Sequence, residues 1–159
     1  MTLHDRRPAQ LDDARGRSAR LLALVVGAVF VVVGILGFIP GITTDHDQLR
    51  FAGHESQAQL LGVFQVSVLH NLLHLGLGVA GLAAARRNSW SVAYLFLGGV
   101  AYLGLWVWGM AVSADSEANL VPLDSADNWL HLGLGVGMLA LGTLGQWLTR
   151  GTVAGDIGQ

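Results

Sequence analysis

Four long stretches without a charged residue constrain the fold of this chain more than any other feature. They cover residues 21–42, 57–85, 88–114 and 128–149. A helix needs about 20 apolar residues to cross the hydrocarbon core of a bilayer, and each stretch is long enough. Buried helices of so small a soluble domain do not require runs of this length. We therefore predict four transmembrane helices, over about residues 20–40, 67–86, 89–113 and 125–149.

The composition agrees with a membrane protein and excludes several other classes. Apolar residues make up 52% of the chain and charged residues only 13%, about half the usual charged share. The 22 glycines are also typical of membrane helices, where glycine lets two backbones approach closely. The absence of cysteine excludes disulfides, thiolate metal sites and cysteine nucleophiles. All nine basic side chains are arginines, and the net charge of −2 gives no indication of nucleic-acid binding.

The arginines predict the orientation of the four spans. If the helices alternate across the membrane, eight of the nine arginines fall on one side: Arg6, Arg7, Arg15, Arg17, Arg20, Arg86, Arg87 and Arg150. The opposite side carries only Arg50, together with several acidic residues. By the positive-inside rule both termini are cytoplasmic. Residues 1–19 would then be an arginine-rich cytoplasmic tail without ordered structure, residues 20–150 the transmembrane domain, and residues 151–159 a second cytoplasmic tail.

One phrase occurs twice in the chain and predicts an internal repeat. The pattern "N-x-L-H-L-G-L-G-V-x-x-L" begins at Asn71 and again at Asn128, with nine identities in twelve positions. A predicted span precedes each copy, so the repeated unit is a hairpin of two helices. Both hairpins would start on the cytoplasmic side, which makes the repeat parallel. Its pseudo-twofold axis would therefore lie along the membrane normal.

The repeat also predicts where spans two and four begin and which faces they bury. Ser67 and Asp124 occupy corresponding positions, and both are good N-cap residues, so the two helices should start there on the outer side. Helical spacing then places Asn71 and Asn128 on stripes of mostly small residues. Small residues permit close helix contact, and polar residues avoid lipid. We therefore predict that spans two and four face each other through these stripes, with these four residues as a polar helix-contact cluster.

Ionisable residues at the outer ends of the same two spans allow three interpretations. They are His70, His74, Asp127 and His131. The first interpretation is structural: hydrogen bonds join the helix pair, and Asp127 pairs with His131 one turn on. The second is a metal site, because a spacing of four places two ligands on one helix face, and three imidazoles with a carboxylate suit zinc or another transition metal. The third is haem b held between His74 and His131 as axial ligands.

The predicted outer loop, residues 41–66, is long for a connection between two helices, and such loops are usually functional or disordered. Its apolar side chains predict that it folds back onto the helices: Phe51, Leu60, Leu61 and Phe64. His46 and His54 stand beside acidic residues, either as further metal ligands or as part of a solvated surface. No arrangement of nucleophile, base and orienting residue is visible, so we do not expect an enzyme.

Three phrases of the chain resemble a known family. They are "GILGFIPGITTD", "RFAGHESQAQLLGVFQVSVLHNLLHLGLGVAGL" and "DNWLHLGLGVGML". They are similar to the small bacterial membrane proteins catalogued as domain of unknown function 4383. The resemblance covers about residues 20–150, which includes all four predicted spans. It implies a four-helix protein of the bacterial inner membrane, and it implies no activity.

The sequence therefore predicts an all-α, multi-pass protein of the bacterial cytoplasmic (inner) membrane. Its partners would be the lipid bilayer and either further copies of itself or a larger membrane complex. The first function that we expect is that of a structural or accessory membrane subunit. The alternative is a metal- or haem-b-binding membrane protein that uses His70, His74, Asp127 and His131.

Overall fold

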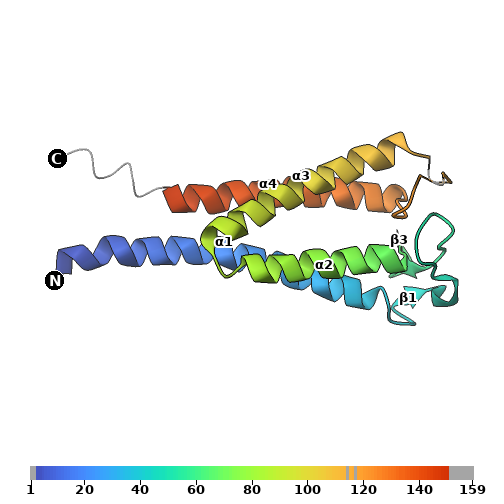
Figure 1. The fold of residues 1–159 in the computed structure, drawn as a ribbon, viewed down its shortest axis with the longest axis horizontal. Helices are drawn as coiled ribbons and strands as arrows, with labels where there is room; N and C mark the ends of the chain where they lie inside the picture. The colour runs from blue at the N-terminus through green and yellow to red at the C-terminus, as the bar shows by residue number, and fades with distance from the viewer. Residues whose placement is uncertain (1–2, 114, 117, 151–159) are drawn as a thin grey trace.

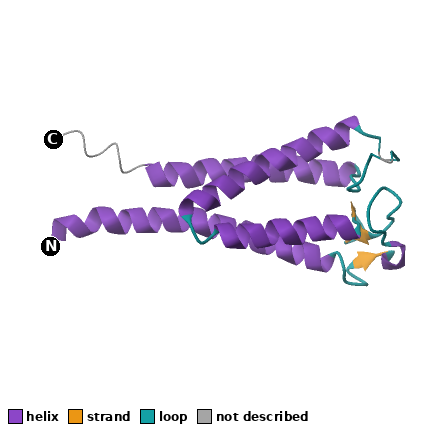
Figure 2. Ribbon diagram, in the orientation of Figure 1, coloured by secondary structure: helices purple, strands orange, loops and turns teal. Residues whose placement is uncertain are grey.

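A computed structural model describes residues 3–113, 115, 116 and 118–150, with side chains from residue 17 to residue 147 of that range. The described part of the chain is helical apart from one small sheet (Figures 1 and 2). Its helices are α1 (Leu3–Leu36), α2 (Val68–Ala84), α3 (Asn88–Ala111) and α4 (Ser125–Arg150). The start of α1 and the end of α4 lie at the same end of the molecule, and the long loop lies at the other. We call these the inner and the outer end.

The helix positions agree with the predicted spans except at the start of the chain. α2, α3 and α4 begin and end within about three residues of the expected bounds. α1 begins at Leu3, so residues 3–19, which were expected to lack ordered structure, are helical. Alanine, leucine, glutamine and arginine favour helix in this segment, and extending an existing helix adds a hydrogen bond for each residue fixed. The predicted C-terminal tail, residues 151–159, lies outside the described residues.

The two predicted N-caps are confirmed. The Ser67 side chain accepts a hydrogen bond from the backbone N–H of His70 at 3.1 Å, and α2 starts at the next residue. The Asp124 carboxylate accepts one from the backbone N–H of Asp127 at 2.8 Å, immediately before α4. Each cap satisfies a backbone donor that has no partner inside its helix. Both helices of the repeated phrase therefore start in the same way.

The helices pair as two hairpins, α1 with α2 and α3 with α4. Close approach in the first hairpin depends on glycine: a methyl group on Gly27 would lie 2.9 Å from the carbonyl oxygen of Gly78 in α2. In the second hairpin, a methyl group on Gly99 would lie 3.0 Å from the carbonyl oxygen of Gly135 in α4. The small residues of α2 and α4 thus face α1 and α3. The prediction that spans two and four pack on each other through these stripes is wrong, because each stripe is occupied within its own hairpin.

A shared apolar core joins the two hairpins. Phe30 of α1 packs with Leu95 and Tyr102 of α3 and with Met138 of α4, and all four side chains are buried. The ring of Phe30 stacks on the ring of Tyr102 with a centroid distance of 5.4 Å. α1 contacts both helices of the second hairpin, whereas α2 approaches α3 only weakly. The hairpins are therefore held together mainly through α1.

The long loop folds over the outer ends of the helices as a small antiparallel sheet (Figure 2). Its strands pair in the order β1 (Thr43–Thr44), β2 (Gln59–Leu60) and β3 (Phe64–Gln65), and a 3₁₀ helix covers His46–Gln48. Leu60 and Phe64 pack near the outer end of α1, as predicted for an inward-folded loop. Phe51 and Leu61 instead are 68% and 65% exposed, so only part of that prediction is confirmed.

Two of the described helices are long and apolar enough to cross a membrane. They are Arg17–Leu36, the apolar part of α1, with a mean hydropathy of 2.7, and α3, with a mean hydropathy of 1.6. α2 is apolar but has only 17 residues. Most of the surface of the two candidate spans is not buried within the protein. These helices therefore differ from core helices of a soluble protein, which bury most of their apolar side chains.

Candidate functional site

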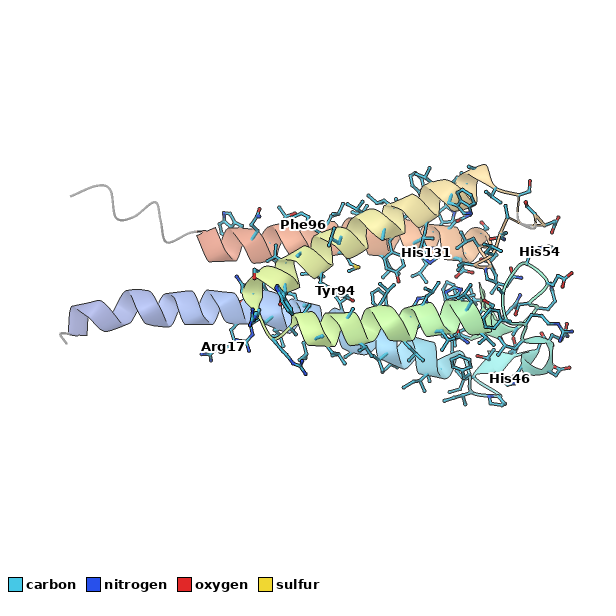
Figure 3. All side chains as sticks on the ribbon, viewed as in Figure 1. Arg17, His46, His54, Tyr94, Phe96 and His131 are labelled. Atoms are coloured by element: carbon cyan, nitrogen blue, oxygen red, sulfur yellow. The ribbon has the colours of Figure 1, made fainter. Side chains whose placement is uncertain are left out.

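A group of buried polar side chains lies between the hairpins toward their outer ends. We call it the polar cluster, and its members are His70, Asn71 and His74 of α2, Tyr102 of α3, and Asp127 and His131 of α4. Each of these side chains is at most 7% exposed. Figure 3 shows His131 between the two hairpins. Helix spacing explains the grouping, because residues four apart share a helix face.

The rings of the polar cluster form a continuous series of contacts. His70 stacks on His74 with ring centroids 4.6 Å apart, and His70 lies 6.3 Å from His131. Tyr102 stacks on His131 at 5.3 Å. Phe30 completes the series from α1, with an edge contact to His74 at 5.7 Å. The structure thus brings together two histidines of α2 and one of α4.

The hydrogen bonds of the cluster define one histidine tautomer. Nδ1 of His74 lies 3.1 Å from the carbonyl oxygen of His70. A carbonyl oxygen can only accept, so the Nδ1–H of His74 donates this hydrogen bond. In the neutral ring, Nε2 then keeps a free electron pair. This backbone bond also fixes the orientation of the ring, an arrangement that is common for histidines that bind a ligand through the other nitrogen.

Several other polar atoms of the cluster have no hydrogen-bond partner among the described residues. They are Nδ1 of His70, Nδ2 of Asn71, the Tyr102 hydroxyl, Oδ2 of Asp127 and Nδ1 of His131. The predicted pairing of Asp127 with His131 is therefore not observed. The His131 ring stacks on Tyr102 of α3 instead. A buried polar group that stays without a partner costs about 1–3 kcal/mol.

Two cavities adjoin the polar cluster. The larger, which we call the α2–α3 cavity, has a volume of about 490 Å³. The smaller, which we call the loop cavity, has a volume of about 230 Å³ and lies beneath β2 and β3. His70, His74 and His131 line both, so their rings form the wall between the two cavities. Asn71 and Asp127 line only the loop cavity, and Tyr102 lines only the α2–α3 cavity.

The residues predicted as metal ligands meet at the loop cavity but do not form a coordination site there. His70, His74, Asp127 and His131 all line it. Even so, no group of three or more His, Asp or Glu side chains in the described residues is arranged to hold a metal ion. His46 is engaged elsewhere, since its Nε2 lies 3.1 Å from the carbonyl oxygen of Phe38. Figure 3 shows His46 and His54 on the outer loop.

The two asparagines of the predicted polar helix-contact cluster each make close contacts within their own hairpin. The Asn71 amide packs against Gly37, the residue that follows α1. The Asn128 side chain packs against Gly109 of α3 and donates a hydrogen bond to its carbonyl oxygen at 3.1 Å. The expectation that both approach a contact between spans two and four is therefore wrong. A glycine leaves room for each amide, Gly37 directly after α1 and Gly109 within α3, so each asparagine contacts the other helical segment of its own hairpin.

Sequence reasoning missed Phe30 and Tyr102. Both lie in spans that are apolar on every face, so no periodicity shows which residues point inward. One signal was present: Tyr102 is a hydroxyl-bearing residue in the middle of an apolar stretch. The two residues also occupy equivalent places, since Phe30 contacts His74 in one hairpin and Tyr102 contacts His131 in the other.

Comparison with known proteins identifies a family. No curated protein and no solved structure matches the chain. A family described as "Domain of unknown function (DUF4383)" matches residues 20–144. The match includes the apolar part of α1, the outer loop, α2, α3 and most of α4, and therefore every residue of the polar cluster. The chain belongs to this family of domains of unknown function.

Proposed function

We propose that this chain is a four-span protein of the bacterial inner membrane, with both termini in the cytoplasm, that acts as a non-enzymatic accessory subunit. The observation that carries the proposal is that apolar side chains cover the outside of the helices and polar side chains lie between them, the opposite of a soluble protein. Large apolar side chains face outward on all four helices, for example Leu24, Val79, Val100 and Val136. The buried polar side chains lie between them. Water would penalise this arrangement, and lipid favours it.

The helix geometry supports four spans rather than two. α3 and α4 have 24 and 26 residues, which at 1.5 Å per residue gives about 36 and 39 Å, enough for a hydrocarbon core of about 30 Å. α2 has 17 residues, or about 26 Å. It runs along α1 in the first hairpin, so it occupies much of the same depth as its neighbour. Its short length is compatible with local thinning of the bilayer.

The distribution of arginines supports cytoplasmic termini. Arg17 lies toward the inner end of the molecule (Figure 3). Arg86 and Arg87 follow α2 in the short connection to α3. Nε of Arg20 donates a hydrogen bond to the carbonyl oxygen of Ala85 at 2.9 Å, which joins the inner parts of α1 and α2. Arginines are enriched on the cytoplasmic side of membrane proteins, which supports a cytoplasmic location for this end.

The exposed residues of the outer loops support an accessory role in an assembly. Phe51, Leu61 and Val63 of the long loop and Leu120 of the α3–α4 connection are apolar and exposed beyond the helix ends. Large apolar side chains that are exposed outside the lipid are candidates for contacts with another protein. Further copies of the chain or another membrane subunit would cover them.

Single-cysteine labelling tests the proposed orientation, and the natural absence of cysteine makes each introduced thiol unique. Gln48→Cys places the thiol on the exposed outer loop, and Ser89→Cys places it at the exposed inner start of α3. In intact bacterial cells, a membrane-impermeant maleimide should label Gln48→Cys. It should label Ser89→Cys only after the inner membrane is permeabilised. The reverse pattern, or equal labelling of both in intact cells, would contradict the proposal.

Metal or haem binding is the second candidate. The observation that favours it is that the imidazole rings of His70, His74 and His131 lie together where the two cavities adjoin. The test is the absorption spectrum and metal content of detergent-purified protein. For an accessory subunit we expect neither a Soret band nor stoichiometric zinc. His74→Ala and His131→Ala should then change only stability, and His54→Ala on the outer loop serves as the control. A Soret band or bound zinc that disappears in the first two variants, but not in the control, would replace the accessory role with cofactor binding.

A further inference from the structure

Three arginines from two separate segments come together where the α2–α3 connection passes α1 (Figure 1). They are Arg20 of α1 and, after the C-cap residue of α2, Arg86 and Arg87; we call them the arginine patch. Nε of Arg20 donates a hydrogen bond to the carbonyl oxygen of Ala85 at 2.9 Å, which holds its guanidinium beside the connection. All three arginines are exposed. The fold thus gathers three positively charged residues at one place on the surface.

The positive charge of the arginine patch is not balanced by acidic side chains. None of its three arginines forms an ion pair within the described part of the chain. The stretches around them, residues 14–44 and 56–114, contain no aspartate or glutamate. The nearest acid before Arg20 is Asp13, about 10 Å away along the axis of α1. Because like charges repel one another, the patch favours a ligand that carries negative charge.

The arginines also keep hydrogen-bond donors for such a ligand. A guanidinium has several N–H groups, and the hydrogen bond of Arg20 uses only Nε. The Arg87 guanidinium lies 5.1 Å from the centroid of the Trp90 ring, a cation–π contact that uses the face of the group and none of its donors. The Arg86 side chain makes no hydrogen bond to the described residues. Since a guanidinium binds two oxygens of one phosphate or carboxylate at once, the patch suits an oxyanion.

The surroundings of the patch indicate an oxyanion that is attached to an apolar tail. The inner ends of the two candidate membrane spans, in α1 and α3, both adjoin the patch. Trp90 is 55% exposed beside it, and tryptophan is typical of the membrane–water interface. Leu21 and Leu24, which are 60% and 46% exposed, continue from Arg20 along α1 toward the outer end. A lipid fits both parts of this surface, whereas a free phosphate or an acidic peptide fits only the charged part.

We propose that the arginine patch binds the phosphate head group of an anionic phospholipid in the cytoplasmic leaflet, as basic sites between membrane helices do. The phosphate oxygens accept hydrogen bonds from the guanidinium groups of the patch, and an acyl chain lies along Leu21 and Leu24. A zwitterionic phospholipid binds more weakly, because the patch has no acid for its ammonium group. The proposal rests on the membrane placement in the proposed function, which the cysteine labelling tests independently of lipid binding.

Native mass spectrometry of the full chain, released from detergent micelles, measures lipid affinity by counting the bound lipid molecules. Dioleoyl phosphatidylglycerol is the anionic probe, and dioleoyl phosphatidylcholine is the zwitterionic probe with the same acyl chains. We expect the anionic lipid to bind about tenfold or more tightly, since each arginine near an anionic membrane surface contributes about fivefold. Equal affinity for the two lipids would overturn the proposal.

Arginine variants locate the binding site. Arg86→Gln and Arg87→Gln each remove one charge from the patch and leave the hydrogen bond of Arg20 in place, so each should lower the affinity for phosphatidylglycerol by about fivefold. Arg50→Gln is the matched control, because it removes the same charge from an exposed position on the outer loop. It should bind as the unmodified protein does, and all three variants should keep its thermal unfolding midpoint in micelles. Equal losses in the patch variants and the control would show that net charge alone attracts the lipid, and would overturn the proposal.

Competition separates a lipid from other sources of negative charge. Glycerol phosphate offers the head group without a tail, and a short polyglutamate peptide offers carboxylates on a protein chain. Neither should displace phosphatidylglycerol at equal concentration, because neither covers the leucines beside the patch. Displacement by glycerol phosphate would assign the patch to free phosphate esters, and displacement by the peptide would assign it to an acidic protein segment. Either result would overturn the proposal.

Discussion

Phe30→Ala should reduce the free energy of unfolding by on the order of 3 kcal/mol, the lower end of the range for truncating a buried phenylalanine. Phe30 is buried and contacts His74 in its own hairpin and Tyr102 in the other. Its removal leaves a cavity where the hairpins meet. The lower end of the range applies because lipid, unlike water, solvates apolar side chains when the helices separate. The lost packing contacts of Phe30 are then the main contribution to the change in unfolding free energy. Denaturation in mixed detergent micelles, followed by circular dichroism, measures the change.

Phe51→Ala is the matched control for this prediction. It makes the same chemical change at a side chain that is 68% exposed on the outer loop. Its effect on unfolding should stay within about 0.5 kcal/mol, as is usual for surface substitutions. Equal losses in the two variants would show that Phe30 does not join the hairpins in the way described.

Gly78→Ala should destabilise the protein by about 1–3 kcal/mol, the usual cost of overpacking. The added methyl group would lie 2.6 Å from the backbone nitrogen of Val31 and 2.8 Å from the carbonyl oxygen of Gly27. Both atoms are backbone, so relief requires α1 and α2 to separate. Thermal unfolding in micelles should show a lower midpoint.

The same helix supplies a control two residues away. Gly76 has no described heavy atom within 4 Å of an added methyl group, and alanine favours helix, so Gly76→Ala should be neutral or stabilising by up to about 1 kcal/mol. The second copy should behave alike: Gly135 is crowded by Leu103 of α3, whereas Gly133 is open. If Gly76→Ala lowers stability as much as Gly78→Ala does, close contact between the backbones is not the cause.

The sequence predicted the helices well because charges and caps define their ends. Ser67 and Asp124 were identified as helix starts from their side chains alone, and their hydrogen bonds confirm this. The start of α1 was not predicted. Residues 3–19 carry several charges, which argue against a membrane span but do not prevent a helix from continuing.

The packing partners of the small-residue stripes could not be read from the repeat. A stripe of small residues indicates close contact but does not say with which helix. The partner is decided by the facing glycines, Gly37 and Gly109, which accept the two asparagines. These glycines lie in spans without a repeated phrase, so sequence comparison of the two copies did not identify them.

The site was predicted in part. His70, His74 and His131 do meet, because they lie on the inner faces of two helices with matching starts. Tyr102 could not be assigned to the site, since the orientation of α3 depends on its packing against α4 and α1. The cavities depend on how far the hairpins diverge, which is a tertiary property that no local pattern encodes.

The two hairpins have different residues at some corresponding positions, and this difference breaks the symmetry of the site. His74 and His131 are the same in both, but Phe30 corresponds to Tyr102, and His70, directly before the first repeated phrase, corresponds to Asp127, directly before the second. A molecule held between two identical halves could bind in two equivalent orientations. The Tyr102 hydroxyl and the Asp127 carboxylate both belong to the second hairpin, so the two halves differ chemically and the two orientations are no longer equivalent.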